Sequence, residues 1–203
     1  MAICLHVAQD ELLDLVDDDD NVIGTIRRSK SGNESHIRVI NIFVVQKNGK
    51  IIIPLRSADR RIFPNCYDFS VGGYVESGDS YKKTAYKELH EELGLENVEL
   101  KELMYIKPSD NIVPIFMKTY FLEYDGDIKD LKYDTKGIQG LYAFSKDEIK
   151  QMLKSNPQKF KGYFQKVFEQ LLSRNLLQSE NLTTRAKSCL LLTYENRTNE
   201  TRI

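Results

Sequence analysis

Three glutamates near the middle of the chain are spaced so that one helix would carry them on a single face. Glu88, Glu91 and Glu92 stand at positions i, i+3 and i+4, and the 3.6-residue period of a helix gathers such positions into one arc. Carboxylates this close raise one another's pKa unless a cation lies between them. Mg²⁺ prefers oxygen ligands and is commonly shared between carboxylates and substrate phosphates. The spacing therefore predicts a site for a divalent cation.

The residues around these glutamates define the helix that must carry them, over about residues 80–93. An apolar stripe that can pack on a core lies on the arc of the helix that adjoins the glutamates. It consists of Ala85, Leu89 and Leu93. Gly94 can adopt the left-handed conformation that ends a helix. Gly72 and Gly73 precede the helix and allow a close approach of backbone, and the Gly73 carbonyl is a candidate metal ligand.

The segment from Gly73 to Leu95 resembles the Nudix box. The family pattern is Gly, five residues, Glu, seven residues, Arg-Glu, an aliphatic residue, any residue, Glu-Glu, any residue, Gly and an aliphatic residue. Seven of its nine specified positions match, namely Gly73, Glu88, Leu89, Glu91, Glu92, Gly94 and Leu95. Two positions depart, because Asp79 replaces a Glu and Lys87 replaces the Arg. A pattern of this length is far more specific than a short glycine motif.

The resemblance implies roles for the acidic face. Glu88, Glu91 and Glu92 would hold Mg²⁺, with Mn²⁺ as an alternative, and Glu88 or Glu92 would also accept a proton from water. Lys87 would replace the arginine that orients a neighbouring carboxylate, with looser geometry because lysine lacks the planar fork. The competing interpretation is a solvated helix face on which Lys87 and Glu91 form an ordinary i, i+4 ion pair.

Charged loops outside the box supply further candidates. The resemblance implies a base from a later loop, and Asp134 is the best candidate, with a solvated loop aspartate as the alternative. Arg56, Arg60 and Arg61 form a basic loop that could hold substrate phosphate or remain in solvent. The expected partner is a small molecule with a diphosphate, nucleoside-linked or related, which the protein would hydrolyse.

A narrower resemblance raises a second enzyme class. The stretch from about Leu12 to Lys150 is similar to the Nudix subgroup close to type 1 isopentenyl-diphosphate isomerase, which moves a double bond by proton transfer. That enzyme needs a cysteine just before the box and a histidine shortly after. Val71 and Tyr74 stand at these positions and cannot do this chemistry. Hydrolysis is favoured, while an isomerase-like enzyme and a catalytically weak Nudix-fold binding or regulatory protein stay open.

Composition narrows the class of protein. The chain has 203 residues, of which 41% are hydrophobic and 29% charged, which suits one globular domain with an appended segment. A net charge of −1 gives no sign of binding to nucleic acid polymers or membranes. Three scattered cysteines and the lack of a basic-then-apolar leader favour a reducing compartment. We expect a cytoplasmic protein, with a homodimer left open.

Apolar runs predict strands on both sides of the helix. The expected strands span 12–16, 22–26, 39–45, 50–55, 67–71, 98–106, 112–121 and 139–144. The first two would form a hairpin around a solvated acidic turn, and the next two a central hairpin across Asn48-Gly49. A capping box at Ser145–Glu148 opens a helix to about residue 153. Aromatic residues at helical spacing from Phe160 onward predict a third helix.

These elements indicate an α+β (mixed α/β) fold, and the resemblance implies the Nudix-type α/β/α sandwich with a mixed sheet and a C-terminal helical extension. We expect the Nudix domain to cover residues 1–155, including the N-terminal hairpin. A C-terminal helix within 156–177 would pack on it, and residues 178–203 would form a polar tail.

Overall fold

The computed structural model of the protein describes residues 10–32 and 36–177. The tail expected over 178–203 lies outside the described residues. Within the described ranges, none of the helices combines the length and the apolar character that crossing a membrane requires.

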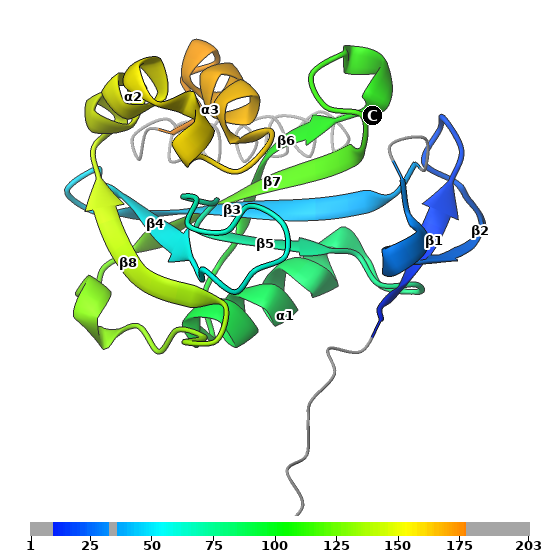
Figure 1. The fold of residues 1–203 in the computed structure, drawn as a ribbon, viewed down its shortest axis with the longest axis horizontal. Coiled ribbons are helices and arrows are strands. Elements are labelled where there is room, and N and C mark those ends of the chain that lie inside the picture. The colour runs from blue at the N-terminus through cyan, green and yellow to red at the C-terminus, as the bar shows by residue number, and fades with distance from the viewer. Residues whose placement is uncertain (1–9, 33–35, 178–203) are drawn as a thin grey trace, which may run out of the picture.

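A mixed six-stranded sheet forms the centre of the fold (Figure 1). Its strands run in the order β6 (Lys101–Ile106), β7 (Phe116–Tyr124), β3 (Arg38–Gln46), β4 (Ile51–Arg56) and β8 (Ile138–Phe144), and β5 (Val71–Tyr74) also pairs with β3. Strands β3 and β7 are parallel, and the other pairs are antiparallel. The predicted α+β class with a mixed sheet is confirmed.

Helices cover both faces of the sheet, because its central strand is apolar on both. Successive side chains of a strand point to opposite faces, so Ile42 and Phe43 in β3 enter different buried clusters. Helices α2 (Lys146–Ser155) and α3 (Phe164–Ser173) pack on the Phe43 side, and α1 (Tyr81–Leu93) packs on the other (Figure 1). The expected capping box of α2 is present, which confirms its predicted start.

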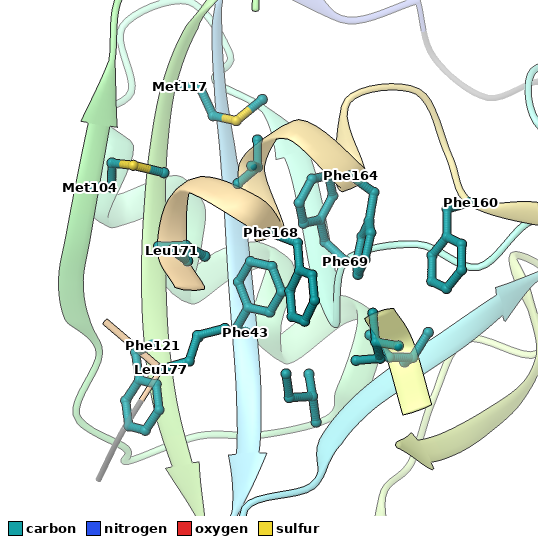
Figure 2. Packing of buried hydrophobic residues seen from close by; sticks show 14 of the residues in the cluster. Phe43, Phe69, Met104, Met117, Phe121, Phe160, Phe164, Phe168, Leu171 and Leu177 are labelled. Atoms are coloured by element: carbon teal, nitrogen blue, oxygen red, sulfur yellow. The ribbon is translucent and has the colours of Figure 1, made fainter. Parts of the chain in front are cut away.

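Aromatic side chains from α3 fill the core beneath it (Figure 2). The Phe164 ring centroid lies 5.1 Å from that of Phe69 and 5.7 Å from that of Phe168. The predicted helix begins later than its spacing suggested, at Phe164. Phe160 lies before it, after the 3₁₀ turn Pro157–Lys159, because it is extended and forms a bridge to the segment ahead of β5.

The N-terminal hairpin is a separate two-stranded sheet beside the start of α1 (Figure 1). Strands β1 (Leu12–Val16) and β2 (Val22–Arg27) pair antiparallel, as the sequence predicted. The hairpin is docked on the loop that leads into α1, because Leu13 forms a bridge with Glu76 and the Ser77 amide donates to the Leu12 carbonyl at 2.8 Å.

Three strand predictions were displaced. The strand expected over 67–71 is β5, which begins at Val71 and includes both glycines, because its pairing with β3 uses only the backbone. Strands β6 and β7 begin at Lys101 and Phe116, three and four residues later than predicted. The start of β7 follows its parallel register with β3, where Arg38 is opposite Phe116. The start of β6 follows its antiparallel pairing with β7, where Lys101 is opposite Phe121.

Candidate active site on helix α1

Helix α1 begins and ends as the sequence predicted. Ser80 caps its start, with the Oγ atom accepting a hydrogen bond from the Lys83 amide. Gly94 ends it with φ 65°, in the left-handed region. The predicted apolar stripe is fully buried and packs on the sheet. This packing fixes which side of α1 the glutamates present.

Two of the three glutamates lie against β5. The Gly72 amide is 3.3 Å from Glu92 Oε2 and donates a hydrogen bond to it. A Cβ atom on Gly73 would fall within 2.6 Å of Glu88 Cγ and closer still to the Glu88 carboxyl group. Glu91 is exposed on the outer side of the helix. Gly73 therefore makes room for the Glu88 carboxylate, the Gly72 amide binds the Glu92 carboxylate, and the Glu91 carboxylate faces solvent.

These two carboxyl groups lie where they are poorly solvated. Burial, reinforced by Glu91, raises the pKa of Glu88 to about 7. Burial, reinforced by Asp68 and then Glu88, raises the pKa of Glu92 to about 8. Neither forms an ion pair with a lysine or arginine within residues 10–32 and 36–177. Removal from water and like charge both favour the neutral forms, so a bound cation would restore ionisation.

The donor set fits a hard divalent cation, because it consists of desolvated carboxylate oxygens that lack a cation of their own. In the described part of the chain, the side chains as they stand form no group of three His, Cys, Asp or Glu residues close enough to hold a metal ion.

Lys87 pairs with a carboxylate other than the one that its helical spacing suggested. Its Nζ donates to Glu76 Oε1, so the i, i+4 pair with Glu91 is not formed. This hydrogen bond raises the pKa of Lys87. Because Glu76 also bridges to Leu13 of the hairpin, the Lys87 contact ties α1 to the loop before it. Asp79 is paired with Lys83 at 2.6 Å.

The structure brings Asp134 to the end of α1 but turns its carboxylate into its own loop. The Asp134 amide donates to the Glu92 carbonyl at 3.2 Å. The carboxylate accepts hydrogen bonds from the amides of Lys136 and Gly137, each at 3.0 Å. A Cβ on Gly137 would lie 2.7 Å from Asp134 Oδ2 and closer to the Arg60 guanidinium. Asp134 and Arg60 therefore lie together beside the end of the helix.

Arg56 uses its donors within its own loop. The guanidinium donates to the carbonyls of Ile62 and Phe63 at 2.8 and 3.0 Å, and to Asp68 Oδ2 at 2.8 Å. Arg61 is exposed. The basic loop, for which phosphate binding and a solvated surface were both left open, is thus held in place by one of its own arginines.

Asp68 is a member of the site that sequence reasoning missed. It is 7% exposed and lies in the segment leading into β5. Its carboxylate is close enough to Glu92 to raise the pKa of that residue, and it is paired with Lys161 Nζ at 3.0 Å. The sequence signal that could have pointed to Asp68 was a charged residue between two aromatic residues, Tyr67 and Phe69. Nothing in the local sequence pointed to Lys161.

The N-terminal hairpin also reaches the site. The Arg28 guanidinium lies 4.4 Å above the centre of the Tyr74 ring and donates to Glu11 at 3.0 Å. Arg28 and Glu11 both act electrostatically on Glu88. Because these residues lie far from the box in sequence, only the docking of the hairpin shows their proximity.

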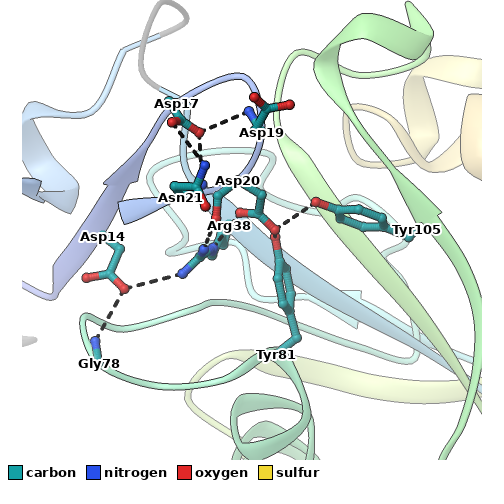
Figure 3. A network of polar contacts seen from close by, with 9 residues as sticks. All are labelled: Asp14, Asp17, Asp19, Asp20, Asn21, Arg38, Gly78, Tyr81 and Tyr105. Carbon is teal, nitrogen blue, oxygen red and sulfur yellow. Dashed lines mark hydrogen bonds and ion pairs between the residues drawn. The ribbon is translucent and has the colours of Figure 1, made fainter. Parts of the chain in front are cut away.

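A partly buried network of polar contacts anchors that hairpin (Figure 3). Asp20 accepts hydrogen bonds from Arg38 Nε at 2.6 Å, the Tyr81 hydroxyl at 3.0 Å and the Tyr105 hydroxyl at 2.7 Å. Burial and the Asp20 charge raise the pKa of Tyr81 and Tyr105. The prediction of a fully solvated acidic turn was wrong for Asp20, because long-range partners from three elements converge on it. Within the turn, Asp17 Oδ1 accepts hydrogen bonds from the amides of Asp19 and Asn21.

Comparison with known proteins places this geometry in context. A family model of the NUDIX domain matches residues 35–165. A protein named as a Nudix hydrolase from Nostoc is 39% identical over 155 residues, which cover 73% of this chain and 89% of the relative. An isopentenyl-diphosphate Delta-isomerase from Serratia proteamaculans is 25% identical over 171 residues, covering 80% and 92%. The crystal structure of DR0079 from Deinococcus radiodurans superimposes with a TM-score of 0.73 at 29% identity, covering 79% and 98%.

Proposed function

Because this chain belongs to the Nudix family, we propose that it is a Mg²⁺-dependent hydrolase that cleaves the phosphoanhydride bond of a diphosphate. The substrate class is a nucleoside diphosphate-linked or related small molecule. The observation that carries the proposal is the pair of desolvated carboxylates, Glu88 and Glu92, held on one side of α1 by the close approach of Gly72 and Gly73.

The acidic face supplies the metal ligands in this proposal. Glu88, Glu91 and Glu92, with the Gly73 carbonyl, would hold Mg²⁺ or Mn²⁺. When bound, the ion would offset the negative charge that develops on the diphosphate oxygens. Glu88 or Glu92 would take the proton of the attacking water, because a pKa near neutral suits a group that must gain and lose a proton.

The remaining candidates have supporting roles in this proposal. Lys87 fixes Glu76 and hence the loop that leads into α1. Asp134 is an alternative base, which would have to leave the two amides of its turn. Arg60, rather than Arg56, is the arginine that we assign to substrate phosphate, because the Arg56 donors already serve its loop and Asp68.

The test is a substrate screen with purified protein and Mg²⁺. The panel contains nucleoside di- and triphosphates, ADP-ribose, dinucleoside polyphosphates and isopentenyl diphosphate. We expect release of phosphate or nucleoside monophosphate by the wild type and a loss of at least about 100-fold in Glu92→Gln. Glu96→Gln, which changes an exposed carboxylate just beyond the helix, should retain the activity. Tight binding of a compound with no turnover would instead favour a binding or regulatory protein.

Isopentenyl diphosphate is included because of the likeness to the Serratia isomerase, the observation that favours an isomerase-like enzyme. Two observations weigh against an isomerase, at the positions where that enzyme needs a cysteine and a histidine. Val71 is fully buried in the core, and the Tyr74 ring is covered by Arg28. An isomerised product formed without phosphate release would nevertheless overturn the hydrolase proposal.

A further inference from the structure

We propose that Arg28, in the 3₁₀ turn Arg28–Lys30 that follows β2, is a second arginine of the substrate site: its guanidinium binds an anionic oxygen of the substrate diphosphate. The inference rests on the proposed function, because it takes a diphosphate as the ligand of this site. Arg28 lies ahead of residues 35–165, which the family model matches. Neither the box nor the rest of that domain therefore predicts it.

The Arg28 guanidinium lies over the strand that contacts the glutamates. Strand β5 ends at Tyr74, and the guanidinium carbon is 4.4 Å from the centre of the Tyr74 ring. The residue before Tyr74 is Gly73, which approaches Glu88 so closely that a Cβ atom would fall within 2.6 Å of Glu88 Cγ. Because consecutive Cα atoms are only about 3.8 Å apart, Arg28 lies at the border of the proposed metal site.

One edge of this guanidinium is open. Both carboxylate oxygens of Glu11 accept from the same nitrogen, Nη1, at 3.0 Å. Within residues 10–32 and 36–177, Nε and Nη2 donate no hydrogen bond, and the side chain is 46% exposed. These two nitrogens form the fork that binds a phosphate through two parallel hydrogen bonds. Arg56, by contrast, donates from all three of its guanidinium nitrogens to the protein itself.

Two partners fix the orientation of that open edge. The Tyr74 ring supports the face of the guanidinium through a cation–π contact, and Glu11 holds the Nη1 corner. A donor that is already oriented loses less freedom when a ligand binds. An anionic substrate must also approach a helix face that carries carboxylates, so a cation at the border of that face would attract it.

The backbone around Arg28 is held independently of its side chain. The Arg28 amide donates to the Glu11 carbonyl at 2.8 Å, and the Ser77 amide donates to the Leu12 carbonyl at 2.8 Å. The turn at the other end of the hairpin is anchored through Asp20 (Figure 3). Replacing the Arg28 side chain should therefore leave the hairpin docked.

The experiment compares Arg28→Gln, Arg28→Lys and Arg27→Gln. Arg27 is the matched control, because it precedes Arg28 in the same hairpin, is exposed and donates from Nη1 to the Asp10 carbonyl at 2.8 Å. Calorimetry would measure the binding of methylenediphosphonate, a non-hydrolysable diphosphate, in the presence of Mg²⁺, and the binding of Mg²⁺ alone. Kinetics with the best substrate of the panel would separate KM from kcat, and limited proteolysis would report whether the hairpin stays docked.

We expect Arg28→Gln to weaken methylenediphosphonate binding by at least about tenfold and to raise KM by a similar factor. The value of kcat should change by less than about threefold, because the contact is made equally in the ground state and the transition state. The affinity for Mg²⁺ alone should stay unchanged. Arg28→Lys should recover part of the loss, since lysine keeps the charge without the fork, and Arg27→Gln should match the wild type.

Four results would overturn the inference. They are an Arg28→Gln variant that binds methylenediphosphonate as tightly as the wild type, an equal loss in Arg27→Gln, a wild type that does not bind methylenediphosphonate, and proteolysis that shows a detached hairpin. Failure of the proposed function looks different. If the wild type hydrolyses nothing in the panel but binds methylenediphosphonate more tightly than Arg28→Gln does, the hydrolase proposal fails and the role of Arg28 stands.

Discussion

The Glu88 carboxyl group occupies the space that a side chain on Gly73 would need. A Cβ atom built on Gly73 falls within 2.6 Å of Glu88 Cγ, a separation that real Cβ atoms essentially never show. Glycine is thus required at position 73 by the contact with helix α1. Its backbone conformation does not require it, because its φ is not positive. Strand β5 and helix α1 approach this closely only because one of the two residues has no side chain.

Replacing Gly73 by alanine should therefore displace the Glu88 carboxylate. We expect hydrolysis to fall by at least about 100-fold, while the free energy of unfolding falls by only about 1–3 kcal/mol, the usual cost of overpacking. Steady-state kinetics and chemical unfolding would measure the two effects. Gly24→Ala is the control, because a Cβ there meets nothing within 4 Å. Full activity in Gly73→Ala would show that Glu88 has no role at this position.

The Lys87 contact with Glu76 predicts a variant that separates activity from stability. Both side chains are more than a third exposed, so Lys87→Ala should lower the free energy of unfolding by less than about 1 kcal/mol. We expect kcat to fall by about tenfold, because the loop entering α1 loses its tie to the helix. Lys87→Arg should retain most of the activity. Lys82→Ala, at an exposed position of the same helix, should have no effect, and an equal loss there would contradict the assignment.

Asp20 should contribute strongly to stability. Replacing it by asparagine removes the nearer of the two charges that compensate Arg38, whose side chain is 15% exposed and then keeps only Asp14 at 3.5 Å. Asparagine tolerates the positive φ of this residue. We expect the free energy of unfolding to fall by about 3 kcal/mol and the hairpin to become more sensitive to limited proteolysis. Asp19→Asn, one residue earlier and exposed, should leave both measurements unchanged.

The raised pKa values of Glu88 and Glu92 predict how the metal-free protein responds to pH. Both start from an ordinary value of 4.5 and rise to about 7 and about 8 on folding, so the folded state binds these protons more tightly than the unfolded chain. Their contribution to stability is complete below pH 4.5 and is lost as the pH rises toward 8. Denaturant unfolding from pH 5 to 8 should show this decline.

Two comparisons isolate that effect. The double variant Glu88→Gln/Glu92→Gln should flatten the decline, since glutamine does not titrate. Adding Mg²⁺ at 100 times its Kd should stabilise the wild type at pH 8 by about 2.7 kcal/mol and leave the double variant unchanged. If, without Mg²⁺, the free energy of unfolding of the wild type depends on pH in the same way as that of the double variant, the two carboxylates are solvated.

Local sequence was sufficient wherever a structure depends on neighbours in the chain. The period of the apolar stripe and the helix-ending Gly94 defined α1 and the face that carries Glu88 and Glu92. The Asn48-Gly49 turn likewise defined the β3–β4 hairpin. Each of these signals acts over a few residues, so each could be read before the fold was known.

Tertiary structure decided which charges meet. The sequence placed Glu88, Glu91 and Glu92 together, but the packing of α1 on the sheet partly buries Glu88 and Glu92 and exposes Glu91. The acidic turn looked solvated until Asp20 met partners from β3, α1 and β6. Asp68 and Lys161 are far apart in the sequence but form an ion pair. They meet because Tyr67 pairs with Phe160, in the segment after α2. Ionic contacts and burial depend on distance in space, and short-range patterns do not carry that information.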